Sequence, residues 1–121
     1  MAKTFSILTI NKISPLGLKR FPAGRYVVRP EIKEPDAIMV RSQNMLEMDI
    51  PVSVKAIARA GAGTNNVPVA KMSARGVPVF NAAGANANAV KELIVTGMLL
   101  SSRNIIPALN FTAGLSGDDA T

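Results

Sequence analysis

Apolar residues along this chain fall into five short runs that are separated by polar segments. Most of the runs are continuous rather than alternating, which is typical of β-strands buried on both faces of a parallel sheet. Short segments between the runs have helical signals, such as the Ser-Pro pair that opens Ser14–Arg20. The pattern predicts an open, doubly wound α/β sheet of about five strands. The predicted strands are Phe5–Ile10, Tyr26–Val28, Ala37–Val40, Ala56–Ala58 and Val77–Phe80.

Two segments between the later strands are candidates for connecting helices. Leu46–Val54 could form one, although a proline interrupts it. Pro68–Ala74 has clearer signals, because Asn65 or Asn66 can cap its start and Gly76 can close its end.

A longer helical pattern follows the last predicted strand. Apolar residues recur at helical spacing from Asn86 to Asn110, which predicts one long amphipathic helix that Pro107 should kink or end. The last residues have the composition of turns. We therefore expect a sheet domain over residues 1–85, a connector helix over 86–110 and a linker over 111–121.

Composition excludes several kinds of chemistry. The 121 residues suit one domain, and 48% hydrophobic with 18% charged residues indicates a folded core. There is no cysteine, so disulfides and thiolate nucleophiles are impossible. There is no histidine either, which removes the usual general base and the commonest metal ligand.

The formal net charge of +6 could attract nucleic acid, an anionic membrane or a small anion. Aromatic residues make up only 4% and basic residues form no run, which disfavours binding of single-stranded nucleic acid. The longest apolar segment, Leu93–Leu100, is far shorter than the roughly 20 residues of a membrane span. No signal peptide is visible, so we expect a cytoplasmic protein with neither nucleic acid nor membrane as partner.

Polar or glycine-rich loops follow three of the predicted strands. Arg41-Ser42 follows the third strand, Gly61-Ala62-Gly63 follows the fourth after Arg59, and Asn81 follows the fifth. Because the carboxyl ends of parallel strands meet at one edge, where ligands of such folds bind, we expect these loops to lie together.

The loop after the fourth strand has the strongest chemistry. Its two glycines let the backbone approach a ligand closely, and a following helix would offer unpaired N–H groups to an anion. Arg41 and Arg59 could add forked donors for a carboxylate or phosphate. A plain strand-to-helix turn with two solvated arginines is the alternative, since Gly-x-Gly is a weak signal by itself.

Other site types do not match. The loop lacks the Gly-Lys-Ser/Thr of a Walker motif and the third glycine of a dinucleotide fingerprint. The acidic residues show no metal-ligand spacing, so we predict no metal site. Glu92 lies in the first turns of the long helix, where a carboxylate interacts favourably with the helix dipole. We expect it to cap the helix or to form an interdomain ion pair rather than to take part in catalysis.

Taken in order, four segments resemble the D-2-hydroxyacid dehydrogenase family, and most closely its members that act on 3-phospho-D-glycerate. The resemblance covers nearly the whole chain, is best from Asp36 to Asn110 and is weak before Val28. The segments that carry it are Met39–Ser42, Ala58–Val67, Arg75–Asn81 and Asn86–Leu93.

This resemblance implies a flavodoxin-like substrate-binding segment, with the helix Asn86–Asn110 leading toward an NAD-binding domain that these residues do not include. It implies hydride transfer from a phosphorylated 2-hydroxy acid to NAD, in a parent protein that forms homo-oligomers. It also implies that backbone N–H groups of Gly61, Ala62 and Gly63 hold the substrate carboxylate, with Ala62 near the nicotinamide.

The resemblance assigns roles to side chains as well. It implies that Arg41 and Ser42 line the substrate cleft and that Arg59 contributes to a basic subsite for the phosphate. Asn81 and Asn86 are further candidates at the cleft.

This sequence also departs from the family pattern. Asn65 stands where an acidic residue is usual, and Ile94 stands where a hydroxyl residue near the cofactor is common. No catalytic residue is expected here, since an acid/base histidine is absent. We therefore expect a fragment that is inactive alone. The alternatives are a family member for glyoxylate, hydroxypyruvate or another 2-hydroxy acid, and a stand-alone anion-binding module.

Overall fold

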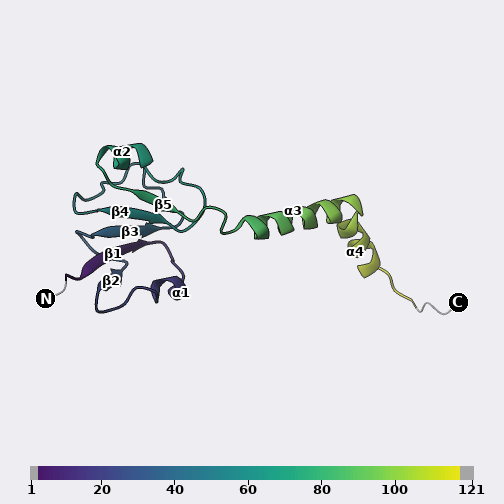
Figure 1. Cartoon of the computed structure of the whole chain (residues 1–121). Helices are drawn as coiled ribbons and strands as arrows, with labels where there is room; N and C mark the ends of the chain where they lie inside the picture. The colour runs from purple at the N-terminus through teal and green to yellow at the C-terminus, as the bar shows by residue number, and fades with distance from the viewer. Residues whose placement is uncertain (1–2, 118–121) are drawn as a thin grey trace. The chain divides into compact units, whose positions relative to one another are not determined.

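The computed structural model describes residues 3–117, in two compact units that meet between Ala85 and Asn86. The first unit is a five-stranded parallel sheet in the order β2-β1-β3-β4-β5 (Figure 1). This confirms the predicted open, flavodoxin-like α/β sheet. The order in which strands are added to the sheet reverses between β1 and β3. Folds of this kind form a crevice at the carboxyl edge next to such a reversal. The strands are β1 Phe5–Ile10, β2 Tyr26–Arg29, β3 Ala37–Val40, β4 Ala56–Arg59 and β5 Val79–Asn81.

The core lies on one face of the sheet. Ile38 and Val40 of β3 and Ile57 of β4 point to this face, and Ile38 is paired with Ile57 in the strand register. Burial of each such side chain contributes about 1.5–3 kcal/mol. The other members come from the β3–β4 connection, the loop after β4, and α2 with the turn that follows it: Met45, Ile50, Val54, Val67, Met72 and Val77.

Helix α2, Val69–Ala74, ends in a glycine turn, as the sequence predicts. Gly76 has a φ of +70°, its N–H donates to Ser73, and the Val77 N–H donates to Met72. This is a Schellman motif, in which Val77 and Met72 also meet in the core. It explains why β5 begins at Val79, two residues later than predicted.

The start of α2 differs from the prediction. Its N-cap is Pro68 without a side-chain hydrogen bond, so neither Asn65 nor Asn66 caps it. Asn66 is instead buried, and its side-chain amide donates to backbone carbonyls of the β3–β4 connection.

The predicted helix Leu46–Val54 is wrong. Only single turns form there, closed by hydrogen bonds from Met48 to Met45 and from Val54 to Pro51. The guanidinium of Arg75 donates to the carbonyls of Ile50 and Pro51 at 2.9 Å each. Pro51 cannot continue a helix, and the arginine satisfies carbonyls that a helix would have used internally.

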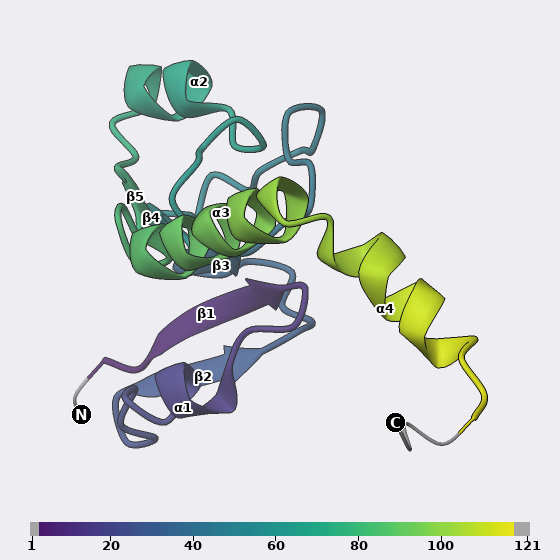
Figure 2. The same ribbon diagram turned by 90° about the vertical axis from the view of Figure 1, so that its right-hand side faces the viewer.

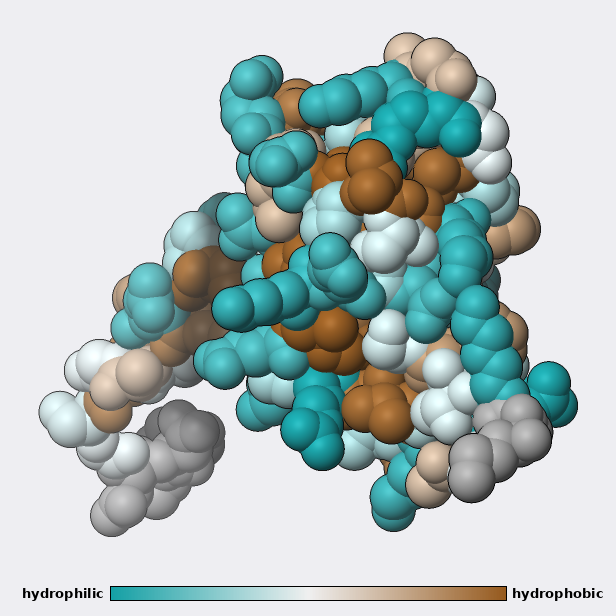
Figure 3. All heavy atoms as spheres, turned by 90° about the vertical axis from the view of Figure 1, so that its left-hand side faces the viewer, coloured by the Kyte–Doolittle hydropathy of each residue, from teal (hydrophilic) through white to brown (hydrophobic). Residues whose placement is uncertain are grey.

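The first half of the sheet is sparsely covered. Helix α1, Pro15–Leu18, is a single turn between β1 and β2 (Figure 2), with Ser14 at its N-cap as the Ser-Pro pair predicts. Residues 30–36, which connect β2 to β3, contain no helix. Figure 3 shows apolar side chains at the surface, between polar ones, on the side of the molecule that it presents.

The second unit contains two helices where the sequence predicts one. They are α3, Ala87–Ser102, and α4, Ile105–Ala113, so helix extends into the segment predicted to be a linker. The break lies at Arg103 and Asn104, and Asn104 has a left-handed φ of 50°. Pro107 accounts for it, because its ring would clash with the Arg103 carbonyl in a continuous helix. Within residues 3–117 no helix is long and apolar enough to cross a membrane.

Candidate functional site

The strand register brings most of the predicted site residues to one edge of the sheet. Val40, Arg59 and Asn81 are neighbours across β3, β4 and β5, so Arg41 and the loop after Arg59 leave the sheet at the same level. Arg41-Ser42, Arg59, Gly61–Gly63 and Asn81 therefore share the carboxyl edge. Asn86 belongs to the second unit, where it is the N-cap of α3 without a side-chain hydrogen bond.

The loop after β4 presents donors that its own fold does not use. In the described part of the chain, the N–H groups of Ala62, Gly63 and Thr64 have no hydrogen-bond partner. The Gly61 N–H differs, because it donates to the Arg59 carbonyl at 2.9 Å. Of the three N–H groups in the predicted backbone cradle, that of Gly61 is therefore occupied, whereas those of Ala62 and Gly63 are unoccupied, as is that of Thr64. Adjacent free N–H groups of this kind suit a carboxylate.

The helix that follows this loop does not contribute as predicted. Helix α2 begins at Val69, and a turn closed by the bond from the Val67 N–H to the Thr64 carbonyl separates it from the glycines. The donors offered to an anion are therefore those of the loop itself.

Gly61 is required by the close approach of Arg59. A Cβ built on Gly61 would overlap the guanidinium of Arg59, so only glycine leaves that side chain in its place. Nε of Arg59 is buried and has no hydrogen-bond partner within residues 3–117. Arg59 is thus folded against the loop with a donor still unsatisfied, which is a polar atom that a bound anion could engage.

Both arginines carry charge that no carboxylate neutralises in the described residues, where the ion pair found is Lys55 with Asp36. Arg41 is exposed and Arg59 is partly buried. Because guanidinium and N–H donors suit an anion, we call the carboxyl edge with Arg41, Arg59 and the unpaired N–H groups the candidate anion-binding edge.

Asn81 supports the loop after β4. Its side-chain amide donates to the Ala62 carbonyl at 2.6 Å, and the neighbouring Ala82 N–H donates to the Gly61 carbonyl at 3.0 Å. The carbonyls of Gly61 and Ala62 are held toward β5, which fixes the orientation of the peptide units that carry the free N–H groups.

Two further asparagines hold the loop after β3, and sequence reasoning missed them. Asn11, directly after β1, accepts the N–H groups of Ser42 and Gln43 on its Oδ1. Asn66 donates from its Nδ2 to the Arg41 and Gln43 carbonyls. The sequence signal that could have identified Asn11 is its position at the end of a strand. Asparagine tolerates the left-handed backbone conformation that often occurs there.

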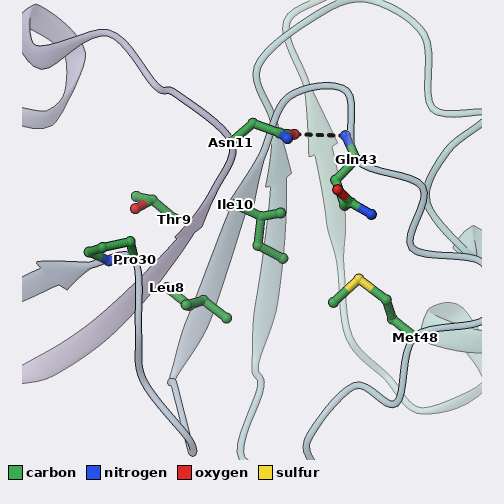
Figure 4. Close-up of a pocket in the computed structure, with 7 residues that line it drawn as sticks. All are labelled: Leu8, Thr9, Ile10, Asn11, Pro30, Gln43 and Met48. Atoms are coloured by element: carbon green, nitrogen blue, oxygen red, sulfur yellow. Dashed lines mark hydrogen bonds between the residues drawn. The ribbon is translucent and has the colours of Figure 1, made fainter.

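A hollow of about 640 Å³ adjoins the end of β1. Figure 4 shows Leu8, Ile10 and Met48 directed into it, with the hydrogen bond between Asn11 and Gln43 at its rim. Because its floor is apolar, it provides no counter-charge for an anion. The groups whose chemistry suits an anion lie instead at the end of β4 and on the loops that follow β3 and β4.

Comparison with protein families shows which known proteins this sequence is similar to. The model of the D-isomer specific 2-hydroxyacid dehydrogenase catalytic domain matches residues 23–117. This chain belongs to that family. The match includes the loops after β3, β4 and β5, and it confirms the family that these loops indicate.

Individual 2-hydroxyacid dehydrogenases differ in the substrate that their names state. Hydroxypyruvate reductase of Thermotoga maritima is 40% identical over 80 residues, which cover 64% of this chain and 26% of that protein. Erythronate-4-phosphate dehydrogenase of Acinetobacter baumannii is 27% identical over 107 residues, which cover 86% and 30%. D-3-phosphoglycerate dehydrogenase of Mycobacterium leprae is 36% identical over 80 residues, which cover 64% and 15%. The chain thus spans less than a third of the length of these relatives.

Proposed function

We propose that this chain is the substrate-binding part of an NAD-dependent D-3-phosphoglycerate dehydrogenase. The reaction would oxidise 3-phospho-D-glycerate to 3-phosphohydroxypyruvate in serine biosynthesis, in a cytoplasmic homo-oligomer. The observation that carries the proposal is that, within residues 3–117, neither Arg41 nor Arg59 pairs with a carboxylate and the N–H groups of Ala62 and Gly63 on the same edge have no partner.

A substrate with two anionic ends matches these groups. The free N–H groups suit the planar carboxylate, and the arginines suit the phosphate, which demands more positive charge. Hydrogen bonds to charged groups are each worth about 1.5–3 kcal/mol. An unphosphorylated acid could use only part of this edge, and that difference separates the candidate substrates.

The proposed role of the chain is to bind and orient. Bound NAD would accept the hydride from C2 of the substrate. These residues fit contact with one side of NAD only. Ala62 would provide that contact, because it is exposed beside the free N–H groups. The loop lacks a dinucleotide fingerprint, so the rest of the cofactor would be bound elsewhere. With no histidine in the sequence, the proton from the hydroxyl would need a group outside these residues.

Titration of the chain with three probes tests the proposal. We expect 3-phosphoglycerate to shift the amide NMR signals of Ala62 and Gly63 at lower concentration than D-glycerate or inorganic phosphate. Arg59→Met should weaken 3-phosphoglycerate about tenfold and D-glycerate much less, since it removes a charged donor for the phosphate. Arg25→Met is the matched control and should leave binding unchanged. Arg25 directly precedes β2, so it lies at the amino ends of the strands, away from the candidate site.

The hydroxypyruvate reductase relative supports a second candidate within the family, a reductase of hydroxypyruvate or glyoxylate. Equal binding of D-glycerate and 3-phosphoglycerate, with no selective effect of Arg59→Met, would favour that candidate. A stand-alone anion-binding module would bind phosphate as well as either acid. No turnover of 3-phosphoglycerate with NAD is expected from the 121-residue chain under any of the three.

A further inference from the structure

The loop Arg41–Gln43 lies between two asparagine side chains that come from different strands. Asn11 follows β1, on one side of β3, and Asn66 follows β4, on the other side. Asn11 accepts hydrogen bonds from the loop, whereas Asn66 donates hydrogen bonds to it. The two amides therefore hold the loop with opposite polarity, Asn11 at Ser42 and Gln43 and Asn66 at Arg41 and Gln43.

Asn66 is committed to the loop. It is only 9% exposed, and its Nδ2 donates to the Gln43 carbonyl at 2.7 Å and more weakly to the Arg41 carbonyl at 3.4 Å. Two carbonyls face this amide, so its NH₂ rather than its oxygen must point at them. Its backbone carbonyl also accepts the N–H of Met45, a fully buried core residue, at 2.8 Å. Asn66 thus ties the loop to both β4 and the core.

Asn11 binds the other side of the loop. With a left-handed φ of 67°, it places Oδ1 at 2.9 Å from the Ser42 nitrogen and 2.7 Å from the Gln43 nitrogen. Both N–H groups are consequently occupied. What the loop can offer to a ligand is its side chains, chiefly the Arg41 guanidinium and the Ser42 hydroxyl.

We infer that Asn11 and Asn66 are positioning residues of the candidate anion-binding edge. They set the backbone of the loop from which Arg41 and Ser42 reach the ligand, and they leave ligand binding by backbone N–H groups to the loop after β4. The inference rests on the proposed function for the ligand that Arg41 would meet, but the clamp itself can be tested without any ligand.

The opposite polarities predict opposite tolerance to a carboxylate. Asn11→Asp keeps the acceptor, whereas Asn66→Asp replaces the donor with an oxygen that repels two carbonyls. Asn11→Gly removes the acceptor without straining the backbone, because glycine adopts the left-handed φ freely. It is therefore the variant to compare with Asn11→Asp. Asn65→Asp is the matched control for Asn66→Asp, since it adds the same charge at the neighbouring exposed position.

The first measurement is amide hydrogen exchange of Ser42 and Gln43 in the full chain without ligand. Loss of one hydrogen bond of about 1 kcal/mol corresponds to roughly fivefold faster exchange. We expect this acceleration in Asn11→Gly and none in Asn11→Asp. In Asn66→Asp the same amides should accelerate as the loop loosens, whereas slow exchange at Ile57 in the core shows that each variant is folded. Unchanged exchange in Asn11→Gly would overturn the inference.

The second measurement repeats the 3-phosphoglycerate titration on the same variants. Asn65→Asp adds a negative charge beside the same loop, so it measures the effect of that charge alone on binding of the anion. Asn66→Asp should weaken binding about tenfold relative to Asn65→Asp, as a misplaced charged hydrogen bond would, whereas Asn11→Asp should stay within about twofold of Asn65→Asp. A loosened loop with undiminished affinity would contradict a positioning role. If the unmodified chain binds no 3-phosphoglycerate, the proposed function fails, and the exchange data still decide whether the two asparagines hold the loop.

Discussion

At the scale of single residues, a substitution of Gly61 should change both the stability of the fold and its affinity for the ligand. The Cβ of an alanine there would displace the Arg59 guanidinium, the flexible end of a side chain that can swing away. We expect Gly61→Ala to cost about 1 kcal/mol of unfolding free energy, because its φ is positive at +157°. Affinity for 3-phosphoglycerate should fall about tenfold, since a charged hydrogen bond is lost. Urea denaturation and NMR titration measure the two effects separately.

Gly24→Ala provides the comparison for that variant. A Cβ at Gly24 meets no atom within 4 Å, so neither stability nor binding should change by much. Should Gly61→Ala bind 3-phosphoglycerate as the unmodified chain does, the placement of Arg59 against the loop would have no part in anion binding.

Apart from Asn86, the site residues that the sequence predicted share one property: each lies at the end of a strand or in the loop that follows it, where residue type and position suffice. Asn11 and Asn66 could not be assigned in that way. Their partners are backbone atoms of residues 41–43, more than twenty positions away in the chain. Only the strand order, which no local pattern contains, brings these amides to the loop.

At the scale of elements, a polar cluster ties three strands together at the edge opposite the candidate site. Asp36, just before β3, accepts hydrogen bonds from the Ser6 N–H and hydroxyl of β1 and from Lys55, just before β4. The hydrogen bond from the Lys55 ammonium, followed by that from the Ser6 N–H, lowers the pKa of Asp36 from 3.8 to about 2. The ionised carboxylate therefore stabilises the folded sheet.

This cluster predicts a loss of stability in acid. A carboxyl whose pKa is lowered by folding contributes its full stabilisation above pH 3.8, and it loses that contribution as the pH falls toward about 2. Asp36→Asn should lower the unfolding free energy at pH 6 and should flatten the pH dependence between pH 4 and 2. Urea denaturation at several pH values measures both. An equally steep decline in Asp36→Asn would assign the acid sensitivity to other groups.

The connection between β3 and β4 shows why element type was harder to predict than strand position. Leu46–Val54 buries Ile50 and Val54 without forming a helix, because Arg75 of another element satisfies its carbonyls. Strands were predictable because a buried strand of a parallel sheet is apolar throughout. The interruption of the long helix by Pro107 was also predictable, and it lies at Arg103 and Asn104 because a proline disturbs the turn that precedes it.

Arg75→Met tests this role of the arginine. The substitution keeps an apolar stem but removes both hydrogen bonds to the Ile50 and Pro51 carbonyls. We expect a loss of about 1–3 kcal/mol in unfolding free energy, measured by urea denaturation. Lys71→Met, on the exposed side of α2, should change it by less than about 0.5 kcal/mol. Equal effects of the two substitutions would mean that Arg75 does not secure the connection.

At the scale of the whole molecule, the two units differ in whether they bury their apolar side chains. Among residues 3–117, every buried hydrophobic residue lies in the sheet unit, and neither α3 nor α4 has a buried residue. Leu93 is 73% exposed, Met98 67% and Phe111 70%. The sequence predicted a helix here from its apolar spacing. It could not show what covers the apolar positions, because that depends on groups outside the helix.

Exposed apolar surface on this scale predicts self-association of the chain in water. We expect the sedimentation coefficient of the 121-residue chain to rise between micromolar and millimolar concentration. The double variant Leu93→Gln and Met98→Gln should reduce that rise, since each substitution removes apolar area that association would bury. A shortened chain of residues 1–85, which retains the whole buried core, should sediment as a monomer throughout. If that shortened chain associates as strongly as the full one, the sheet unit rather than the helices drives association.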